Sequence, residues 1–588
     1  MSANLIVALI LIAIIGIAAA KVIYDFKKKN YCEFCGGNCG GTCEGCNACK
    51  GVIVPIEDDG GSDGKEERGS LTGHAGRTSL KVISAQALAL RMSTALKVLA
   101  VIAVAILIAS SAAVILCTRP DGGGGEKEED AYLFATYERT IVENVTLKTY
   151  YTDGYFSEPS TVRNNSLMTF ALCLELSCGY DDGGDGSRRS DAVVKLLGDI
   201  GCDRVAVNDC YTKESTPTST DIAIGAKAVG DSTVLFVAIN GALYGGEFAS
   251  NMMLGASGDH AGFSKSARDT IDFLREFIQD NGIAGKAKIL ITGYSRAAAA
   301  SNLMGAYLAD AMAGGTEKDL VGDVDIARED VYCFGFETPY CGSWSKESGR
   351  PAPTDARYGN IWYTTNPDDL FTYAPAAEWG FCRYGNRIVL DSHDRESAEA
   401  MLGYAREFFG DVTAEALDMS KFIRASIFIP SMKSFNEGFF EKLFASVDGG
   451  REYYHACMEE DFATVAYVVK THWSVPGDFL DEYGGNATAL LRDIAGHFND
   501  PEEDFRSHFG PKVLSALEKS GCSQYADSIT GALYQAAKVL NSYCKGSLTR
   551  LVTDGYVLTV AYNGLLMIMP HMPSMTLCYL VQDDPNYG

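Results

Sequence analysis

The segment 286–312 constrains the fold most strongly, because it predicts a strand, a tight turn and a helix in immediate succession. The apolar run KAKILITGY is typical of a buried strand, and the alanine-rich run that ends at Met312 is typical of a helix. Between them stands the pentapeptide Gly293-Tyr294-Ser295-Arg296-Ala297. A turn of this G-x-S-x-A type presents the serine hydroxyl at a helix N-terminus, where developing negative charge is favoured. The pattern predicts a nucleophile at Ser295, with an ordinary tight turn as the alternative.

The segments around this turn predict a parallel sheet. Residues 232–239, STVLFVAI, form a continuous apolar run of the kind found in a strand buried on both faces. Residues 267–285 have apolar positions at helical spacing, and 329–342 and 360–375 again have the character of strands that end in turns. Strand and helix patterns that alternate in this way indicate an α/β fold.

The region between the first strand and Ser295 carries a series of short motifs. In chain order they are Asn240-Gly241-Ala242, Glu247-Phe248, Ser250-Asn251 and His260-Ala261-Gly262-Phe263. Together with the serine turn they resemble the fungal-type class 3 lipases and related bacterial lipase-family proteins. The resemblance implies an α/β-hydrolase fold and hydrolysis of carboxylic esters, as by a triacylglycerol lipase. Asn240 replaces the usual arginine, and Ala297 replaces the usual glycine.

The acid and the base of a hydrolase triad should follow the serine in the order Asp, then His. In NIWYTTNPDDLFTYAP the resemblance aligns Asp369 as the acid, with the neighbouring Asp368 as the alternative. It aligns His571, in IMPHMPSMTLCYL near the C-terminus, as the base. His508 and His497 are the alternatives to His571.

Two backbone donors are expected to hold the oxyanion, the N–H groups of Ala242 and Arg296. The hydrolase reaction needs no cofactor. A peptidase or a thioesterase on the same fold remains an alternative, and so does a non-catalytic hydrolase-like domain. A panel of ester, thioester and peptide substrates would separate these classes.

The domain organisation follows from these motifs. We expect a hydrolase core over residues 131–390, an inserted and mostly helical cap over 391–548, and a C-terminal hydrolase segment over 549–588. Within 391–548, stretches such as NATALLRDIAGHF and SITGALYQAAKVLNSYC have helical periodicity. Residues 118–130, with four glycines followed by EKEED, form a stalk before the core.

Two apolar runs precede the stalk, at Leu5–Ala20 and Val98–Cys117. A helix needs about 20 apolar residues to span a bilayer, so we expect transmembrane helices at 1–24 and 98–117, with a cleaved signal peptide as the alternative for the first. Lysines at 21–29, with Arg91 and Lys97, should keep the loop 25–97 in the cytosol. The chain is then a multi-pass protein of the cell membrane whose hydrolase domain faces outside.

A cysteine cluster opens the predicted cytosolic loop; it comprises Cys32, Cys35, Cys39, Cys43, Cys46 and Cys49. Thiolates at this spacing can converge on a soft metal such as Zn or Fe. With the apolar run before it, the segment resembles the FeoB-associated Cys-rich membrane proteins, which implies a link to iron handling. A metal-free flexible linker is the alternative.

The cysteines outside this cluster and the net charge of the chain support two further expectations. Proximity in sequence makes Cys202–Cys210, Cys333–Cys341 and Cys522–Cys544 candidate disulfides of an extracellular domain. The formal net charge of −26 argues against binding to nucleic acid, whose phosphates require basic partners. The expected partners are therefore an ester or lipid substrate and the membrane.

Overall fold

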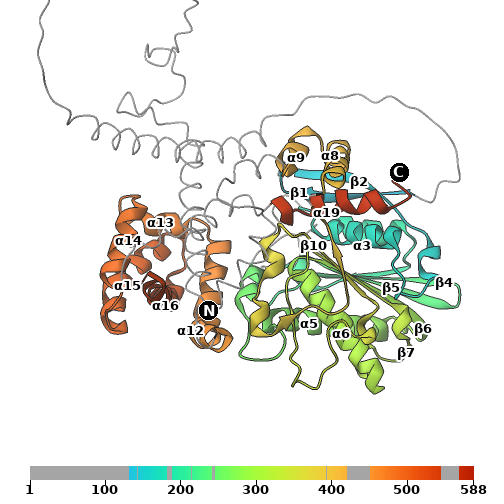
Figure 1. The fold of residues 1–588 in the computed structure, drawn as a ribbon, viewed down its shortest axis with the longest axis horizontal. Coiled ribbons are helices and arrows are strands. Elements are labelled where there is room, and N and C mark those ends of the chain that lie inside the picture. Colours follow the sequence, from blue (N-terminus) through green and yellow to red (C-terminus); the bar gives the residue numbers. More distant parts are fainter. Residues whose placement is uncertain are drawn as a thin grey trace, which may run out of the picture. The chain divides into compact units, whose positions relative to one another are not determined.

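The computed structural model describes residues 131–587, apart from 142, 182–188, 214, 242–245, 392–393, 420–449 and 545–568 (Figure 1). The predicted membrane helices at 1–24 and 98–117, the cysteine-rich segment 25–97 and the stalk 118–130 lie outside these residues. Among the helices of the described ranges, none has the length and apolar character needed to cross a bilayer.

A mixed sheet forms the centre of the described chain. Its strands run in the spatial order β12-β10-β8-β6-β5-β4-β3, and the short β7 pairs with β6. β5, β6, β8, β10 and β12 pair in parallel, whereas β4 pairs antiparallel with both β3 and β5. Their bounds are β3 Arg204–Val207, β4 Ile222–Val229, β5 Ser232–Ile239, β6 Gly285–Tyr294, β7 Val324–Asp325, β8 Val331–Phe336, β10 Ile361–Thr365 and β12 Asn386–Val389. The predicted α/β architecture is confirmed, and this sheet is consistent with an α/β-hydrolase fold.

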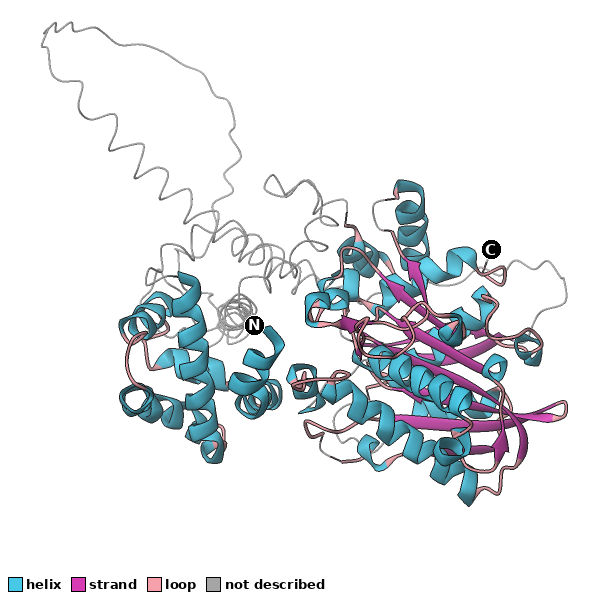
Figure 2. Ribbon diagram, turned by 60° about the horizontal axis from the view of Figure 1, so that its bottom comes forward, coloured by secondary structure: helices cyan, strands magenta, loops and turns pink. Residues whose placement is uncertain are grey.

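Helices cover both faces of the sheet (Figure 2). α5 (Ala261–Asp280) and α6 (Arg296–Gly314) pack on one face, while α3 (Asn165–Cys178) and α19 (Pro573–Leu580) pack on the other. Strand β5 shows why its sequence is apolar throughout. Leu235, Val237 and Ile239 belong to the α5–α6 core, and the residues between them belong to the α3–α19 core. A strand buried on both faces has no polar side to alternate with.

Smaller elements complete the part of the chain that is built around this sheet. The hairpin of β1 (Ala131–Glu138) and β2 (Glu143–Tyr150) joins the α3 core through Phe134 and Leu147. The other helices and strands here are α4 Asp191–Asp199, α7 Glu317–Val321, β9 Gly342–Ser343 and β11 Phe381–Cys382. Short 3-10 helices lie at η1 Asp153–Phe156, η2 Asp209–Tyr211, η3 Gly246–Met252, η4 Arg328–Asp330, η5 Ala356–Tyr358, η6 Leu370–Tyr373, η7 Ala377–Trp379, η9 Met569–His571 and η10 Val581–Asp583.

The segment 391–548, expected as a helical cap, divides into two parts. α8 (Arg395–Phe409) and α9 (Asp411–Leu417) contribute Met401, Ala405 and Leu417 to the same core as α3 and α19. The second part has an apolar cluster of its own, formed by Val468, Val475, Val513, Leu517 and Cys522. We call residues 450–544 the helical module; it contains α12 Gly450–Thr471, α13 Val475–Asp481, α14 Ala487–Gly496, α15 Glu502–Lys519, η8 Ser523–Tyr525 and α16 Ala526–Cys544.

The candidate disulfides are wrong. Cys202, Cys210, Cys333, Cys341 and Cys522 are all free thiols, so none of the three proposed pairs is formed. Cys333 and Cys341, which form one of the three candidate pairs, have other partners. The Cys333 thiol donates to the backbone carbonyl of Ser301 at 3.2 Å, and the Cys341 thiol donates to Asn302 at 3.4 Å. Proximity along the chain did not bring these sulfur atoms together.

Candidate active site

Ser295 stands at a sharp bend between β6 and α6. Its φ is 55° and its ψ is −120°, a conformation that costs energy for any residue with a side chain. Its own N–H donates to the carbonyl of Phe336 at 2.8 Å, which ties the bend to the neighbouring strand β8. A Cβ at Gly293 would lie 2.4 Å from the Ala297 carbonyl oxygen, so the turn requires glycine there. The strained serine is therefore held by the strands and by the small residues around it.

Three side chains distant in sequence meet at this bend. His571 Nε2 lies 2.7 Å from Ser295 Oγ, and His571 Nδ1 lies 2.5 Å from Asp369 Oδ2. Ser295 follows β6, Asp369 lies in the turn after β10, and His571 ends η9. The structure thus brings together the three residues predicted as nucleophile, acid and base.

The acid is fixed in place by its own turn. Asp369 is fully buried, and its Oδ1 accepts the backbone N–H of Phe371 at 2.8 Å. Asp368, the alternative, is also buried, but the carboxylate in contact with His571 Nδ1 is that of Asp369. The alternative bases His497 and His508 lie in the helical module and contact Asp493 there.

Aromatic side chains surround the imidazole. The Phe371 ring lies 4.6 Å from the His571 ring, and 44% of Phe371 remains exposed. Tyr294 is buried, and its hydroxyl donates to the backbone carbonyl of His571 at 3.1 Å. Ser295 is itself 7% exposed. The histidine is therefore anchored from inside, and an apolar ring that solvent can reach lies beside it.

A second buried carboxyl group lies beside the acid. Glu337 follows β8 with a positive φ of 47°, and its Oε2 accepts the N–H of Asn366 at 2.6 Å. Burial raises the pKa of Glu337 well above its ordinary value, and the adjacent charge of Asp369 raises it further. A side-chain hydrogen bond between Glu337 and Asp369 also raises the pKa of Glu337. Glu337 was not among the residues predicted from the sequence, where its only signal was an acidic residue directly after a fully apolar strand.

The oxyanion donors are only partly described. Ala242 lies outside the described residues. The N–H of Gly241 beside it donates to Glu175 Oε1 at 3.0 Å, and a Cβ at Gly241 would lie 1.8 Å from the Tyr294 carbonyl oxygen. Burial raises the pKa of Glu175 to about 8, although the Gly241 N–H opposes the shift. The loop before Ala242 is therefore packed directly against the serine bend.

Arg296, the other expected donor, begins α6. Its side chain is buried, and its guanidinium donates to Ser266 Oγ at 2.8 Å and to the Ser219 carbonyl at 3.1 Å. These contacts connect the first turn of α6 to α5 and to the loop before β4. The side chain thus holds the helix N-terminus, and the backbone N–H of Arg296 lies at the residue that follows the nucleophile.

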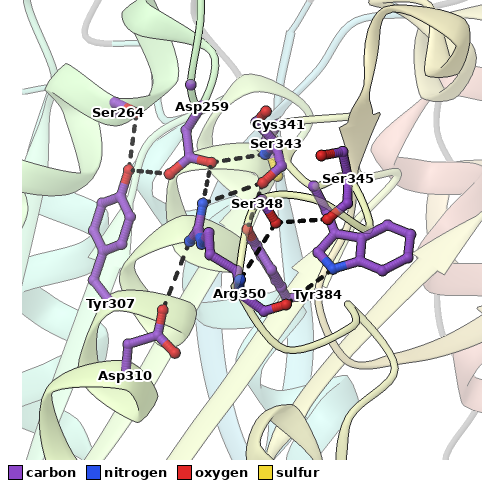
Figure 3. A network of polar contacts seen from close by, with 12 residues as sticks. Asp259, Ser264, Tyr307, Asp310, Cys341, Ser343, Ser345, Ser348, Arg350 and Tyr384 are labelled. Carbon is purple, nitrogen blue, oxygen red and sulfur yellow. Dashed lines mark hydrogen bonds and ion pairs between the residues drawn. The ribbon is translucent and has the colours of Figure 1, made fainter. Parts of the chain in front are cut away.

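His260 has a structural role. It is fully buried, its Nδ1 accepts the N–H of Phe263 at 3.3 Å as the cap of α5, and burial lowers its pKa to about 3. The preceding Asp259 accepts hydrogen bonds from Arg350 at 2.9 Å and from Tyr307 at 3.1 Å (Figure 3). This network holds the start of α5, the helix to which Arg296 is bonded.

No protein-family model matches the chain, and the comparison with curated proteins gives no match. Solved structures similar to it are fungal lipases. Lipase II from Rhizopus niveus has 15% identity and a TM-score of 0.24, covering 40% of this chain and 80% of its own. The lipase of Rhizopus microsporus var. chinensis has 15% identity and a TM-score of 0.25, covering 38% and 71%. The triacylglyceride lipase of Rhizomucor miehei has 14% identity and a TM-score of 0.24, covering 40% and 78%.

Proposed function

We propose that this protein is a serine hydrolase that cleaves carboxylic esters, in the manner of a lipase. The supporting observation is the continuous chain of contacts from Ser295 through His571 to the buried Asp369. A serine hydroxyl is a weak nucleophile unless a base accepts its proton, and the base must be held in the correct tautomer. Asp369 can hold the proton of His571 on Nδ1, which leaves Nε2 free to accept the proton of Ser295.

The acylation step uses each of these groups. Ser295 Oγ attacks the ester carbonyl carbon while its proton moves to His571 Nε2, and Asp369 stabilises the imidazolium that forms. The N–H groups of Arg296 and Ala242 would hold the oxyanion of the tetrahedral intermediate. Collapse of this intermediate breaks the ester C–O bond, and the leaving alcohol takes the proton from His571.

Deacylation repeats these steps with water as the nucleophile. His571 Nε2 removes a proton from water, the hydroxide attacks the acyl carbon, and Ser295 Oγ leaves with the proton returned by His571. The exposed ring of Phe371 beside His571 offers an apolar contact for the acyl or alcohol group. This contact suits an ester of apolar groups, and a panel of ester, thioester and peptide substrates tests peptidase and thioesterase activity.

A fluorophosphonate probe tests the proposal most directly, because it reacts with an activated serine whatever the natural substrate. Labelling of the full chain, lost in Ser295→Ala, is the expected result. An intact chain that is not labelled and does not hydrolyse any ester of a chain-length series would mean a non-catalytic domain. In that case the metal-handling segment would be the main functional part.

We further propose that helices at 1–24 and 98–117 hold the protein in the cell membrane, with the hydrolase domain outside. The lysines at 21–29, with Arg91 and Lys97, support this orientation, because basic residues beside a membrane helix favour the cytosolic side. Protease added to intact cells should remove an epitope placed after residue 130 and spare one near Gly60. The reverse pattern would overturn this topology.

The cysteine cluster of residues 32–49 is proposed to bind Zn or Fe in the cytosol. Six thiols separated by glycines offer soft ligands on a chain able to wrap one ion. A metal titration of the peptide 30–52 under reducing conditions tests this. A peptide that stays metal-free at micromolar concentrations would make the segment a linker.

A further inference from the structure

We propose that the helical module binds one divalent transition-metal ion of the Zn²⁺ class through Asp493, His497 and His508. This site is separate from the triad and from the cysteine-rich segment, and it does not depend on the proposed ester hydrolysis. The three residues offer one carboxylate oxygen and two imidazole nitrogens that all lie within 4.8 Å of one another. Imidazole and carboxylate are ligands that zinc takes in proteins.

Two adjacent helices bring these atoms together. Asp493 lies on α14 and His497 ends it, four residues later, so the two side chains project from the same face. His508 comes from α15, and its ring stacks on that of His497 with centroids 4.0 Å apart. The two imidazoles therefore approach the same carboxylate from neighbouring helices.

The spacing of the ligand atoms suits a small ion. His497 Nε2 lies 3.7 Å from Asp493 Oδ1, and His508 Nε2 lies 3.1 Å from the same oxygen. Ligands at about 2.1 Å from a tetrahedral zinc ion are roughly 3.4 Å apart. Side-chain movements of a few tenths of an ångström would bring these pairs to that spacing.

His497 is oriented as metal-binding histidines usually are. Its Nδ1 lies 2.6 Å from Asp500 Oδ2, so the carboxylate holds the ring proton on Nδ1. Nε2 then carries the lone pair, 3.7 Å from Asp493 Oδ1. A carboxylate on the far nitrogen fixes the tautomer and the ring direction of a ligand histidine in this way.

The amino group of Lys512 lies between Asp493 and His508, which shows that this position favours positive charge. Lys512 Nζ donates to Asp493 Oδ2 at 2.7 Å and lies 2.8 Å from His508 Nε2, which is itself 2.9 Å from Asp493 Oδ2. In the tautomer of His508 with its proton on Nδ1, the lone pair of Nε2 is available to the ammonium group, as it would be to a metal ion. Lys512 is about a quarter exposed on a long stem, so it can move into solvent when a divalent ion replaces it.

The cluster is also accessible. The side chains of His497 and His508 are 28% and 34% exposed, which gives an ion a path from solvent. Partly exposed ion pairs contribute little to stability, so a network of this size gains little as a purely stabilising device. Tyr483 donates to Asp493 Oδ2 at 2.8 Å and holds the carboxylate in place for a ligand role.

The test uses the full chain in which the six cysteines at 32, 35, 39, 43, 46 and 49 are changed to serine, so that the N-terminal thiolates cannot bind. This parent is titrated with Co²⁺, followed by absorption and by calorimetry. We expect one ion per chain, with the visible bands of nitrogen and oxygen ligands and without a thiolate charge-transfer band. Zn²⁺ should displace the bound Co²⁺.

Matched variants assign the ion to the cluster. His508→Ala and His497→Ala should weaken Co²⁺ binding by about tenfold or more, because each removes one ligand. His472→Ala, which changes a histidine of the same module outside the cluster, should bind like the parent. Lys512→Met keeps all three ligands and removes the competing cation, so it should bind more tightly.

Each outcome of these titrations either supports the metal site or overturns it. Equal affinity in the parent, His497→Ala and His508→Ala would overturn the proposal, and so would a Co²⁺ spectrum with thiolate character only. Circular dichroism shows whether the histidine variants fold. If they do not, Lys512→Met gives the answer alone, and binding no tighter than that of the parent would overturn the site.

Discussion

Two clusters in this molecule place a histidine against a carboxylate, and they differ in what the other ring nitrogen meets. In both, Nδ1 lies within 2.6 Å of an aspartate oxygen, Asp369 for His571 and Asp500 for His497. Nε2 of His571 faces a serine hydroxyl, whereas Nε2 of His497 faces a second carboxylate. An oriented imidazole is therefore not in itself a catalytic base. The group at Nε2 decides whether it removes a proton or favours a cation.

The two clusters also differ in how far their carboxylates are buried. The side chain of Asp369 is 0% exposed and that of Asp500 is 34% exposed. A charge removed from water interacts more strongly with its partner, so losing a partner costs more in the buried cluster. The largest effects are therefore expected in the buried cluster.

Loss of the nucleophile or the base should have the largest effect. We expect Ser295→Ala and His571→Ala each to reduce kcat for a p-nitrophenyl ester by about 10⁴-fold or more, because triad members act as a unit. The double variant should be hardly slower than either single one. Rates that multiplied in the double variant would show that the two residues act independently.

Loss of the acid should follow closely. Asp369→Asn is expected to reduce kcat by about 10³- to 10⁴-fold, since an amide at this position favours the wrong tautomer of His571. Asp368→Asn is the matched control and should cost far less. If Asp368→Asn caused the greater loss of kcat, the assignment of the acid would be reversed.

Removal of the second carboxyl group should have an intermediate effect. Glu337→Ala takes away the hydrogen bond to Asp369, and such a bond to a charged group contributes about 1.5–3 kcal/mol, or roughly 10- to 100-fold in kcat if fully expressed. Glu337→Gln keeps a neutral donor and should recover most of the rate while KM changes little. Equal losses in both variants would mean that Glu337 is needed only for packing.

Stability should depend on pH through Glu175. Burial raises its pKa from the ordinary 4.5 to about 8, so the folded state holds a proton that the unfolded state releases. Its contribution to stability is present below pH 4.5 and is lost as the pH rises toward 8. Glu175→Gln should therefore show a smaller fall in Tm between pH 5 and pH 8 than the parent.

The surface variant Glu396→Gln serves as the control for this measurement, because Glu396 is exposed on α8. It should follow the parent at every pH. Parallel Tm curves for the parent and Glu175→Gln would show that Glu175 is not a buried acid whose protonation is linked to folding.

The smallest effect should come from the second histidine cluster. We expect His497→Ala to leave kcat and KM for ester hydrolysis within about twofold of the parent, because its carboxylate partners lie in the helical module. Steady-state kinetics without added metal checks this. A large loss of kcat would remove the distinction between the two clusters.

Much of the candidate site could be predicted because its signals are local. The turn around Ser295 needs small residues at fixed positions, and the resemblance to a lipase family, with its order serine, acid, base, pointed to Asp369 and His571. Glu337 could not be found in this way. Its partner is 32 residues away in sequence, and the two meet only because β8 and β10 pair in parallel.

The wrong disulfide candidates and the unrecognised histidine cluster also result from contacts that depend on tertiary packing. Cys333 and Cys341 are close in sequence, but Cys333 lies within β8 with its thiol directed at α6, so the two sulfur atoms have different partners. His497 and His508 were considered only as spare bases, because their convergence depends on the packing of α14 against α15. Side-chain pairs made by tertiary packing leave little trace in a single sequence.

The position of His571 has a consequence for the timing of activity during synthesis. The short segment from η9 through α19 carries the base and also supplies Met575, Leu577 and Leu580 to the core. A nascent chain that has grown only to the end of α16 already contains the sheet, Ser295 and Asp369. It lacks the imidazole of His571 and the apolar side chains that α19 supplies to the core. If the protein is the ester hydrolase proposed above, such a chain is inert toward esters inside the cell that makes it and becomes competent only when its last helix docks.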